Sequence, residues 1–270
     1  MAAPSATGRR SGAALFAGYA FPPNELGYCG PDGSSVLLEG GATGDLDTEV
    51  ARRARLFDGA WPYLELIAAA TGIADPLDPR VVRAYWLGGD LLDHVDGEVF
   101  EALVRDRFGA QPGVTERLDH GRVGGRIMDA GVIGAGVIGA GPHHGFHVLV
   151  VYPWIGLLDR GPGVALSVLD SCRVRWGLVE SVDGDRVSVR TPALQLAGGE
   201  LVLGGEQALT ARWAAAGHAF VSSPQPGEWV ALHWDWVCDR LSDDAVVELR
   251  GRTDRQLAAA NAWLASRHPG

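Results

Sequence analysis

The chain of 270 residues carries a formal net charge of −10, and 47% of its residues are hydrophobic. This length and apolar content suffice for one large core or two smaller ones without cross-links. The negative charge repels nucleic-acid phosphates and anionic membrane surfaces, so we expect neither as a partner. The three cysteines, at positions 29, 172 and 238, are too few for a disulfide framework, and we expect a cytoplasmic protein with reduced thiols.

The first part of the chain is predicted to be mainly helical. Residues 1 to about 10 are small, polar and basic, which is typical of a disordered end. Pro22 and Pro23 interrupt the short apolar run that follows, so a secretory signal has little support. Over 45–72, apolar residues recur at three- and four-residue spacing, which predicts one helix, or two shorter ones because of Pro62. Two further helices are predicted at 79–94 and 97–108.

Glycines and turn residues mark the middle of the chain. The pentapeptide GVIGA occurs twice in tandem at 131–140, which indicates a loop or a helix end, because the unit is too short for a solenoid repeat. It is also far shorter than the roughly 20 residues of a membrane span. The apolar run at 146–153 predicts a buried strand, and the turn-rich run at 157–166 predicts a linker. We therefore predict two domains, 1–165 and 166–270.

The second part of the chain is predicted to be β-rich. Short β-branched and aromatic runs, separated by turn residues, extend from Val174 to Cys238. A helix is predicted to begin near Ser242, which precedes acidic residues, and a break in it at Gly251 is left open. The predicted fold class is α+β: a mainly α-helical N-terminal domain is followed by a small β-barrel and a C-terminal helix.

Cys172 and His233 are the leading candidates for metal ligands. Thiolate and imidazole suit a soft or borderline transition metal such as iron, and two ligands from different strands leave coordination positions open. The neighbouring Arg173 and Arg175 are expected to lower the pKa of the thiol and favour its thiolate form. Two alternatives stay open: Cys172 as a small apolar residue at a strand start, and His233 as a hydrogen-bonded histidine at the barrel surface.

Two sequence blocks surround these candidate ligands. Cys172 opens the run CRVRWGLV, and VDGD follows at 182–185. The run PGEWVALH ends at His233, and LSDDA follows at 241–245. The two blocks, in this order, resemble those of the HypC/HupF/HoxL family of NiFe-hydrogenase maturation chaperones, which are small OB-like barrel proteins. The resemblance covers about 168–265 of the chain.

The resemblance implies that Cys172 and His233 hold iron, or an Fe(CN)2CO unit, on its way to a hydrogenase. It implies the hydrogenase large-subunit precursor and a HypD-like maturation scaffold as partners, and docking on the precursor without retained metal as a related role. A metallochaperone or assembly factor is thereby favoured over an enzyme. The chain departs from the family in placing Cys172 internally, so no free α-amino group adjoins the thiol, and Trp176 stands where the family has proline.

The run PHHGFH offers a second candidate site, with His143, His144 and His147 in one short segment. His143 and His147 have the i,i+4 spacing that holds a metal on a helix. Gly145 and the predicted strand argue against a helix, and in a strand these two would share a face with His144 opposite. The alternative function is a metal-dependent enzyme with its active site in the N-terminal domain around this segment. A structural or merely polar turn is the competing interpretation.

The first half also contains the three motifs PPNELGYCGP, AWPYLELIA and FHVLVVYPW, at 22–31, 60–68 and 146–154. They resemble motifs of a group of actinobacterial proteins of unassigned function. This resemblance implies no chemistry, but it suggests that the two halves belong together in one protein. Cys29, in the first motif, is either an exposed thiol with a catalytic or metal-binding role or part of a tight turn packed on Tyr28.

Overall fold

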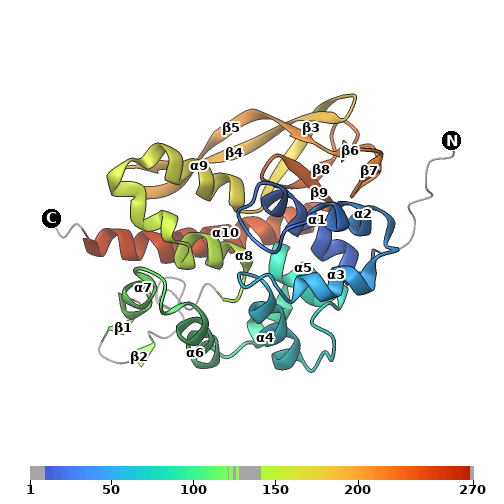
Figure 1. The fold of residues 1–270 in the computed structure, drawn as a ribbon. Coiled ribbons are helices and arrows are strands. Elements are labelled where there is room, and N and C mark those ends of the chain that lie inside the picture. Colours follow the sequence, from blue (N-terminus) through green and yellow to red (C-terminus); the bar gives the residue numbers. More distant parts are fainter. Residues whose placement is uncertain (1–9, 121, 124–125, 128–140, 268–270) are drawn as a thin grey trace.

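The computed structural model describes residues 10–120, 122–123, 126–127 and 141–267. Within these residues the chain is α+β, as predicted: helices make up the N-terminal part, and a β-barrel and a long C-terminal helix follow (Figure 1). Most of the predicted disordered end and the GVIGA repeat lie outside the described residues.

Helices α1 to α7 form the N-terminal part, with the short 3-10 helix η1 between α5 and α6. Their bounds are α1 (Gly12–Glu25), α2 (Ser35–Thr43), α3 (Asp47–Ala54), α4 (Trp61–Thr71), α5 (Pro79–Leu87), η1 (Asp90–His94), α6 (Gly97–Phe108) and α7 (Val114–His120). Helix α1 is buried from Gly12 to Asn24, and the sequence prediction missed it because a helix that is apolar all round has no amphipathic period. Pro22 and Pro23 lie in its last turn and do not end it earlier.

The other helices predicted in this part are present, although the one predicted at 79–94 is shorter than expected. The region 45–72 holds two shorter helices, α3 and α4, and Pro62 lies in the first turn of α4 instead of interrupting it. The region 79–94 is divided at Gly88, whose φ of 100° ends α5 before η1 begins. Helix α6 spans the predicted 97–108.

The segment from residue 141 to Cys172 corrects two predictions. The predicted strand at 146–153 is helical, and the predicted linker at 157–166 leads into a helix. The elements are α8 (His144–Phe146), the π-helix η3 (His147–Val151), the 3-10 helix η4 (Pro153–Arg160) and α9 (Pro162–Cys172). A short apolar run that is buried on every side does not distinguish a strand from a helix, and residues 143–151 are all buried.

Strands β3, β4, β5, β9 and β8 form a closed barrel in that order. Their bounds are β3 (Arg175–Asp183), β4 (Arg186–Ala197), β5 (Glu200–Arg212), β8 (Trp229–His233) and β9 (Trp236–Leu241). Neighbouring strands are antiparallel except for a single parallel pairing of Arg212 in β5 with Trp236 in β9. The predicted run that ends at Cys238 is divided into β8 and β9 by a turn at Trp234, whose φ is 54°. The OB-like character of the barrel stays a prediction.

Smaller elements complete the fold. Two short pairs of strands are present: β1 (Arg122–Val123) with β2 (Arg126–Ile127), and β6 (Ala214–Ala215) with β7 (His218–Ala219). The predicted C-terminal helix is confirmed as α10 (Asp243–Arg267), and Gly251 does not break it. Among the described helices, none has the combination of length and apolar composition that a membrane span requires.

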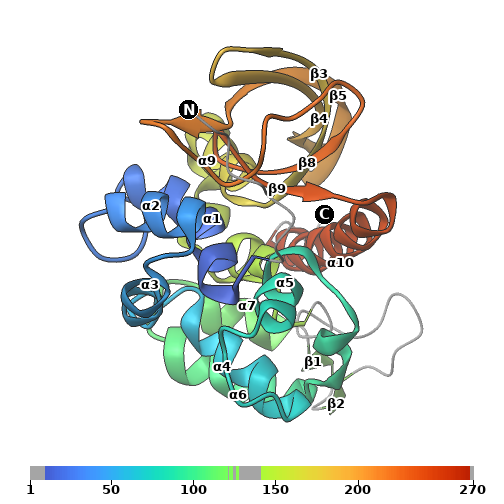
Figure 2. The same cartoon turned by 90° about the vertical axis from the view of Figure 1, so that its right-hand side faces the viewer.

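One buried cluster of apolar side chains joins the helices to the barrel. Phe21 of α1 packs edge-on against Trp236 of β9, with ring centroids 5.0 Å apart, and Trp86 of α5 lies in the same cluster as Trp176 of β3. Cys238 belongs to it as well, as predicted for a core residue. Figure 2 shows the barrel on one side of the molecule and α4 and α6 on the other, with α1 and α10 between them. The predicted domain boundary does not interrupt this core, and the division into two domains stays a prediction.

Candidate metal centre

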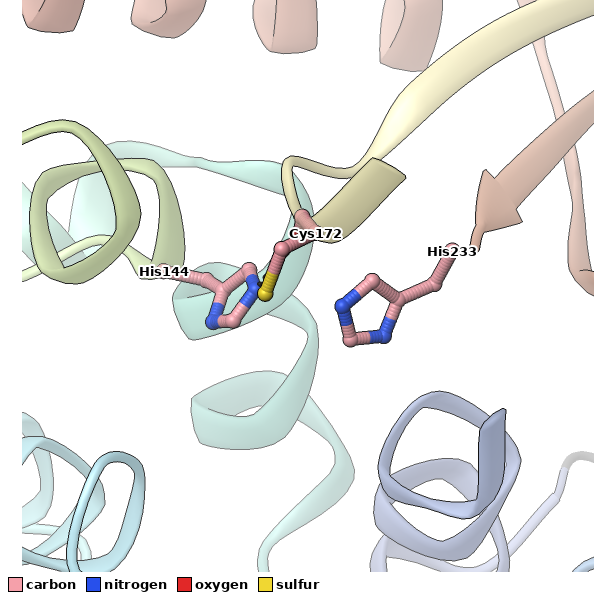
Figure 3. Close-up of side chains that lie close together, drawn as sticks. All are labelled: His144, Cys172 and His233. Atoms are coloured by element: carbon pink, nitrogen blue, oxygen red, sulfur yellow. Dashed lines mark hydrogen bonds between the residues drawn. The ribbon is translucent and has the colours of Figure 1, made fainter. Parts of the chain in front are cut away.

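His144, Cys172 and His233 form a buried cluster that could hold a metal ion. One ligand atom from each residue lies within 4.8 Å of the other two. Figure 3 shows the thiol of Cys172 between the two imidazole rings. The side chains come from three places in the chain, because His144 begins α8, Cys172 ends α9 and His233 ends β8. Both sequence-predicted candidate sites therefore contribute to one cluster.

A turn of the barrel brings Cys172 and His233 together. Trp234, directly after His233, adopts a left-handed conformation that reverses the chain between β8 and β9. Its backbone N–H donates to the carbonyl of Ser171 at 2.7 Å. Since Ser171 directly precedes Cys172, this hydrogen bond ties the end of α9 to the end of β8 and sets the two ligands side by side.

The imidazole of His233 is oriented for metal binding. Its Nδ1 lies 2.7 Å from the carbonyl oxygen of Tyr19. Because a carbonyl can only accept, Nδ1 carries the proton and Nε2 keeps its lone pair. This Nε2 is buried and has no hydrogen-bond partner among the described residues. Metal-binding histidines commonly have this arrangement, in which one nitrogen donates to a carbonyl and the other faces the ion.

The ring of His144 is held from two sides. Its Nε2 lies 2.9 Å from the carbonyl oxygen of Cys172, and its Nδ1 lies 3.2 Å from the hydroxyl of Tyr85. That hydroxyl donates its one proton to the carbonyl of Gly59 at 2.7 Å. Because the carbonyl of Cys172 can only accept, Nε2 of His144 carries the ring proton and Nδ1 keeps the lone pair that a metal ion would use. The indole of Trp86 packs against the His144 ring, with centroids 4.4 Å apart. The helical conformation of this segment points His144, and not its neighbours, toward Cys172.

Burial keeps both imidazoles neutral. It lowers the pKa of His233 to about 4, and it lowers the pKa of His144 well below its usual value, with the nearby His233 adding to the effect. Neutral imidazole is the form that binds metals, so neither ring has to lose a proton near neutral pH. The cluster is therefore prepared to accept a cation at two of its three positions.

The thiol of Cys172 is protonated in the metal-free protein, which corrects the predicted effect of its arginine neighbours. Burial raises the pKa of Cys172 above its usual range. Arg173 forms an ion pair with Asp170 at 2.8 Å, and Arg175 donates to the carbonyl of Trp234. Both guanidinium groups thus bind other partners. A metal ion bound at the cluster would supply the positive charge that a thiolate requires.

A small cavity adjoins the three ligands. Its volume is about 40 Å³, and its wall consists of small apolar, aromatic and metal-binding side chains. The lining residues are Ala20, Pro23, Cys29, Phe57, Gly59, Ala60, Tyr85, Trp86, His144, His147, Tyr152, Cys172 and His233. A single water needs about 10–15 Å³, so the space suffices for an ion and a small further ligand. Cys29 is half-buried at this cavity, a position that its turn-rich motif alone did not predict.

His143 and His147 lie outside the cluster. His147 lines the cavity, and its Nδ1 is 3.1 Å from the hydroxyl of Tyr63. His143 accepts a hydrogen bond from the Gly145 N–H at 2.9 Å and so caps α8. Among the described residues, neither histidine belongs to a group of three or more ligand atoms that lie close together. A metal-binding role for these two histidines stays a prediction.

Comparison with known proteins places the chain in a family. It matches the model of a family of unknown function, DUF6390, over residues 8–267. The chain belongs to this family. The match extends through the helical part, the barrel and α10, so all three ligands of the cluster lie within it. No curated protein and no solved structure matches the chain.

Proposed function

We propose that this protein binds a transition-metal ion through His144, Cys172 and His233 and acts as a carrier or assembly factor for that metal. The observation that supports this most is the unpartnered Nε2 of His233, buried beside a thiol, a second imidazole and a cavity. Burying an unpaired nitrogen costs free energy, and a bound ion removes that cost. Two imidazoles and one thiolate suit a borderline metal such as iron, although zinc accepts the same ligands.

We further propose iron, free or as an Fe(CN)2CO unit, as the metal carried. Support comes from the resemblance of the second half to hydrogenase maturation chaperones, since Cys172 and His233 are the two residues that it implicates. Three protein ligands leave at least one coordination position for exogenous ligands or for transfer. The partners in this proposal are the hydrogenase large-subunit precursor and a HypD-like scaffold, and docking on the precursor without retained metal is its related form.

A metal-dependent enzyme is the second candidate. His144 belongs to the PHHGFH segment, so the enzyme hypothesis and the carrier hypothesis now concern one buried cluster. An open coordination position beside a cavity is also what a catalytic metal needs. A metal-dependent enzyme with its site on the histidine segment itself, and not on the shared cluster, would be favoured if metal remained bound after replacement of Cys172 and His233 and was lost on replacement of His143, His144 and His147.

Metal content tests the proposed binding site directly. The full-length protein is loaded anaerobically with Fe²⁺, dialysed, and its metal measured beside variants. We expect the wild type to retain a single ion and Cys172→Ala and His233→Ala to lose it. Cys238→Ala, in the main core, and His94→Ala, which is exposed, are matched controls that should retain it. Retention of iron by Cys172→Ala would contradict the assignment of Cys172 as a metal ligand.

Infrared spectroscopy tests whether the iron is carried as an Fe(CN)2CO unit. After anaerobic coexpression with hydrogenase-maturation proteins, bands of CO and cyanide should copurify with the wild-type protein. They should be absent from the Cys172→Ala protein. Retained iron without these bands would restrict the role to binding of the bare ion. A pull-down of the large-subunit precursor that depends on Cys172, with no iron in either sample, would instead favour docking.

A further inference from the structure

The loop between α1 and α2, residues 26–34, contributes Cys29 to the wall of the cavity beside the cluster and is termed the cover loop. Its Cys29 lines the cavity together with Cys172 and His233. Cys29 is half-buried, whereas Cys172 is only 4% exposed. Among the described residues, Cys29 is not one of the three whose ligand atoms lie within 4.8 Å of one another. The loop therefore adds a second thiol, closer to solvent, to a buried three-ligand site.

Contacts with neighbouring aromatic residues keep the cover loop closed. The ring of Tyr28 packs on the indole of Trp234, with centroids 4.3 Å apart. The hydroxyl of Tyr152 donates to the carbonyl of Tyr28 at 3.4 Å. Tyr28 is 41% exposed, so solvent reaches this contact. Because Trp234 directly follows His233, the loop rests on the same turn that positions one of the ligands.

An ion-pair group provides a second attachment at the start of the cover loop. Arg212 of β5 donates to Glu25 at 2.5 Å and to Asp235 at 3.1 Å. Glu25 ends α1 directly before the loop, and Asp235 lies in the β8–β9 turn. These side chains are partly exposed, and ion pairs of this kind are weak. These attachments to the barrel can therefore break without unfolding the core, while Nδ2 of Asn24 still donates to the carbonyls of Cys29 and Pro31 at 2.8 Å each and ties the loop to the end of α1.

We propose that Cys29 is a transfer ligand, which binds the incoming metal ion while the cover loop is open and passes it to the buried cluster as the loop closes. This inference rests on the proposed function, because it requires the cluster to bind a metal. Two thiols at different depths of one cavity, with the unpartnered Nε2 of His233 buried at 1% exposure, provide a stepwise path from solvent to the site.

Each step exchanges ligands and leaves the oxidation state of the metal unchanged. Cys29 releases its proton to water and replaces a water molecule on the ion. Cys172 then releases its own proton and forms a bond to the metal, and Cys29 leaves the ion and takes up a proton again. The nitrogens of His144 and His233 replace further water molecules. The net change is one metal–thiolate bond at Cys172 and one proton released, so Cys29 affects the rate of binding and not the affinity.

Rates of Co²⁺ binding test the transfer step. Uptake, and release to a chelator, are followed by the absorption of the cobalt–thiolate bond in the full-length wild type and in Cys29→Ser. We expect both rates to fall by the same factor, about tenfold or more, with an unchanged dissociation constant. Cys238→Ser is the matched control and should keep both rates. Unchanged rates in Cys29→Ser would overturn the transfer role, and so would a weaker dissociation constant with altered absorption, which would make Cys29 a permanent ligand.

Thiol labelling of the metal-free protein tests the opening of the cover loop independently. Mass spectrometry gives the labelling rate of each cysteine. We expect Cys29 to react fastest and Cys172 next, because opening of the loop exposes it. Cys238 should react slowest, since it is fully buried in the main core and requires global unfolding. Equal rates for Cys172 and Cys238 would overturn the loop opening and leave metal binding by the cluster untouched.

A variant that removes one negative charge next to the cover loop sharpens the labelling measurement. Glu25→Gln removes the ion pair with Arg212 and should raise the labelling rate of Cys172 about threefold. Glu180→Gln removes the comparable exposed pair with Arg190 and should change nothing. An unchanged labelling rate of Cys172 in Glu25→Gln would contradict the role of this ion pair in holding the cover loop closed. Loop opening in a wild-type protein that binds no Co²⁺ would instead overturn the proposed function and, with it, the transfer role.

Discussion

The barrel and the segment from residue 141 to Cys172 both supply ligands to the cluster, but they hold these ligands in different ways. In the barrel, β8 pairs with β3 on one side and with β9 on the other, so backbone ladders fix His233. In the segment, successive short helical turns are held by side chains that bind backbone groups. Arg117 of α7 is the clearest example, because it donates to the carbonyls of Val150 and Val151. The short turns next to His144 thus depend on individual side-chain bonds that one substitution can remove.

The largest expected effect is a decrease in the free energy of unfolding in acid. It depends on buried histidines, and the segment contains more of these than the barrel. Burial lowers the pKa of His143 to about 3, helped by nearby arginines, and lowers the pKa of His147 and of His233 to about 4. The unfolded chain, with histidine pKa values near 6.5, then binds protons that the folded chain does not. The free energy of unfolding of the metal-free protein should therefore fall by several kcal/mol as pH decreases from about 6.5 to about 4.

Urea titrations across this pH range check that expectation. His143→Gln should make the pH dependence shallower, because it removes one of the groups that the unfolded state protonates. His94→Gln, at an exposed position, is the control and should leave the slope unchanged. Equal slopes for wild type and His143→Gln would show that this histidine is not held neutral by the fold.

Arg117→Leu should give the next largest effect. The side chain is 2% exposed, donates to buried carbonyls of the segment and lies 5.2 Å from the ring of Trp263. Its removal leaves those carbonyls unpaired, at a cost of about 2–4 kcal/mol in the free energy of unfolding. Arg190→Leu, on the exposed face of β4, should change it by less than about 0.5 kcal/mol. A similar decrease in the free energy of unfolding in both variants would contradict the difference between the barrel and the segment from residue 141 to Cys172.

Gly30→Ala tests how closely the cover loop fits the helices. A Cβ at this position would lie 2.3 Å from the ring of Phe57, and the backbone φ is 79°. Gly27→Ala in the same loop is the matched control, since its φ is 75° and a Cβ there would have no atom of the described residues within 4 Å apart from its own chain neighbours. Backbone strain should lower the free energy of unfolding of both variants by about 1 kcal/mol. In Gly30→Ala the contact with Phe57 should lower it by about 1–2 kcal/mol more. Equal losses in urea unfolding would mean that the loop yields freely at Phe57.

Tyr85→Phe should have the smallest effect on stability and a selective effect on the metal. The hydroxyl lies 3.2 Å from Nδ1 of His144, the nitrogen left to bind the ion, and is fixed by its hydrogen bond to the carbonyl of Gly59, so its loss removes a contact that positions this nitrogen. We expect about tenfold weaker Co²⁺ binding. Tyr63→Phe, whose hydroxyl contacts His147 instead, should bind Co²⁺ like the wild type. A reversed order in Co²⁺ titrations would place the ion nearer His147 than the cluster suggests.

The barrel and most helices could be predicted from the sequence because their patterns are local. Alternating residues, the turn at Gly184 and the serine before α10 each indicate an element without knowledge of its neighbours. In the segment from residue 141 to Cys172, residues 143–151 lack such a pattern, since all of them are buried. Their helical turns are set by distant groups such as Arg117, which no local rule identifies.

In the candidate site, too, some residues could be predicted from the sequence and others could not. Cys172 and His233 were selected by ligand chemistry and by a family resemblance, and the structure brings their ligand atoms within 4.8 Å of each other. The choice of His144 among three neighbouring histidines depends on the helical conformation of α8, which the sequence did not predict. The position of Cys29 at the same cavity depends on how the cover loop packs against Phe57, which no local pattern predicts.

X-ray absorption spectroscopy of the metal-loaded protein tests metal binding by the cluster most directly. We predict one sulfur ligand and two imidazole nitrogens, at about 2.3 Å and about 2.0–2.1 Å if the ion is zinc. The sulfur contribution should disappear in Cys172→Ala and persist in Cys238→Ala. A first shell made only of nitrogen and oxygen in the wild-type protein, or one that Cys172→Ala leaves unchanged, would contradict binding by His144, Cys172 and His233.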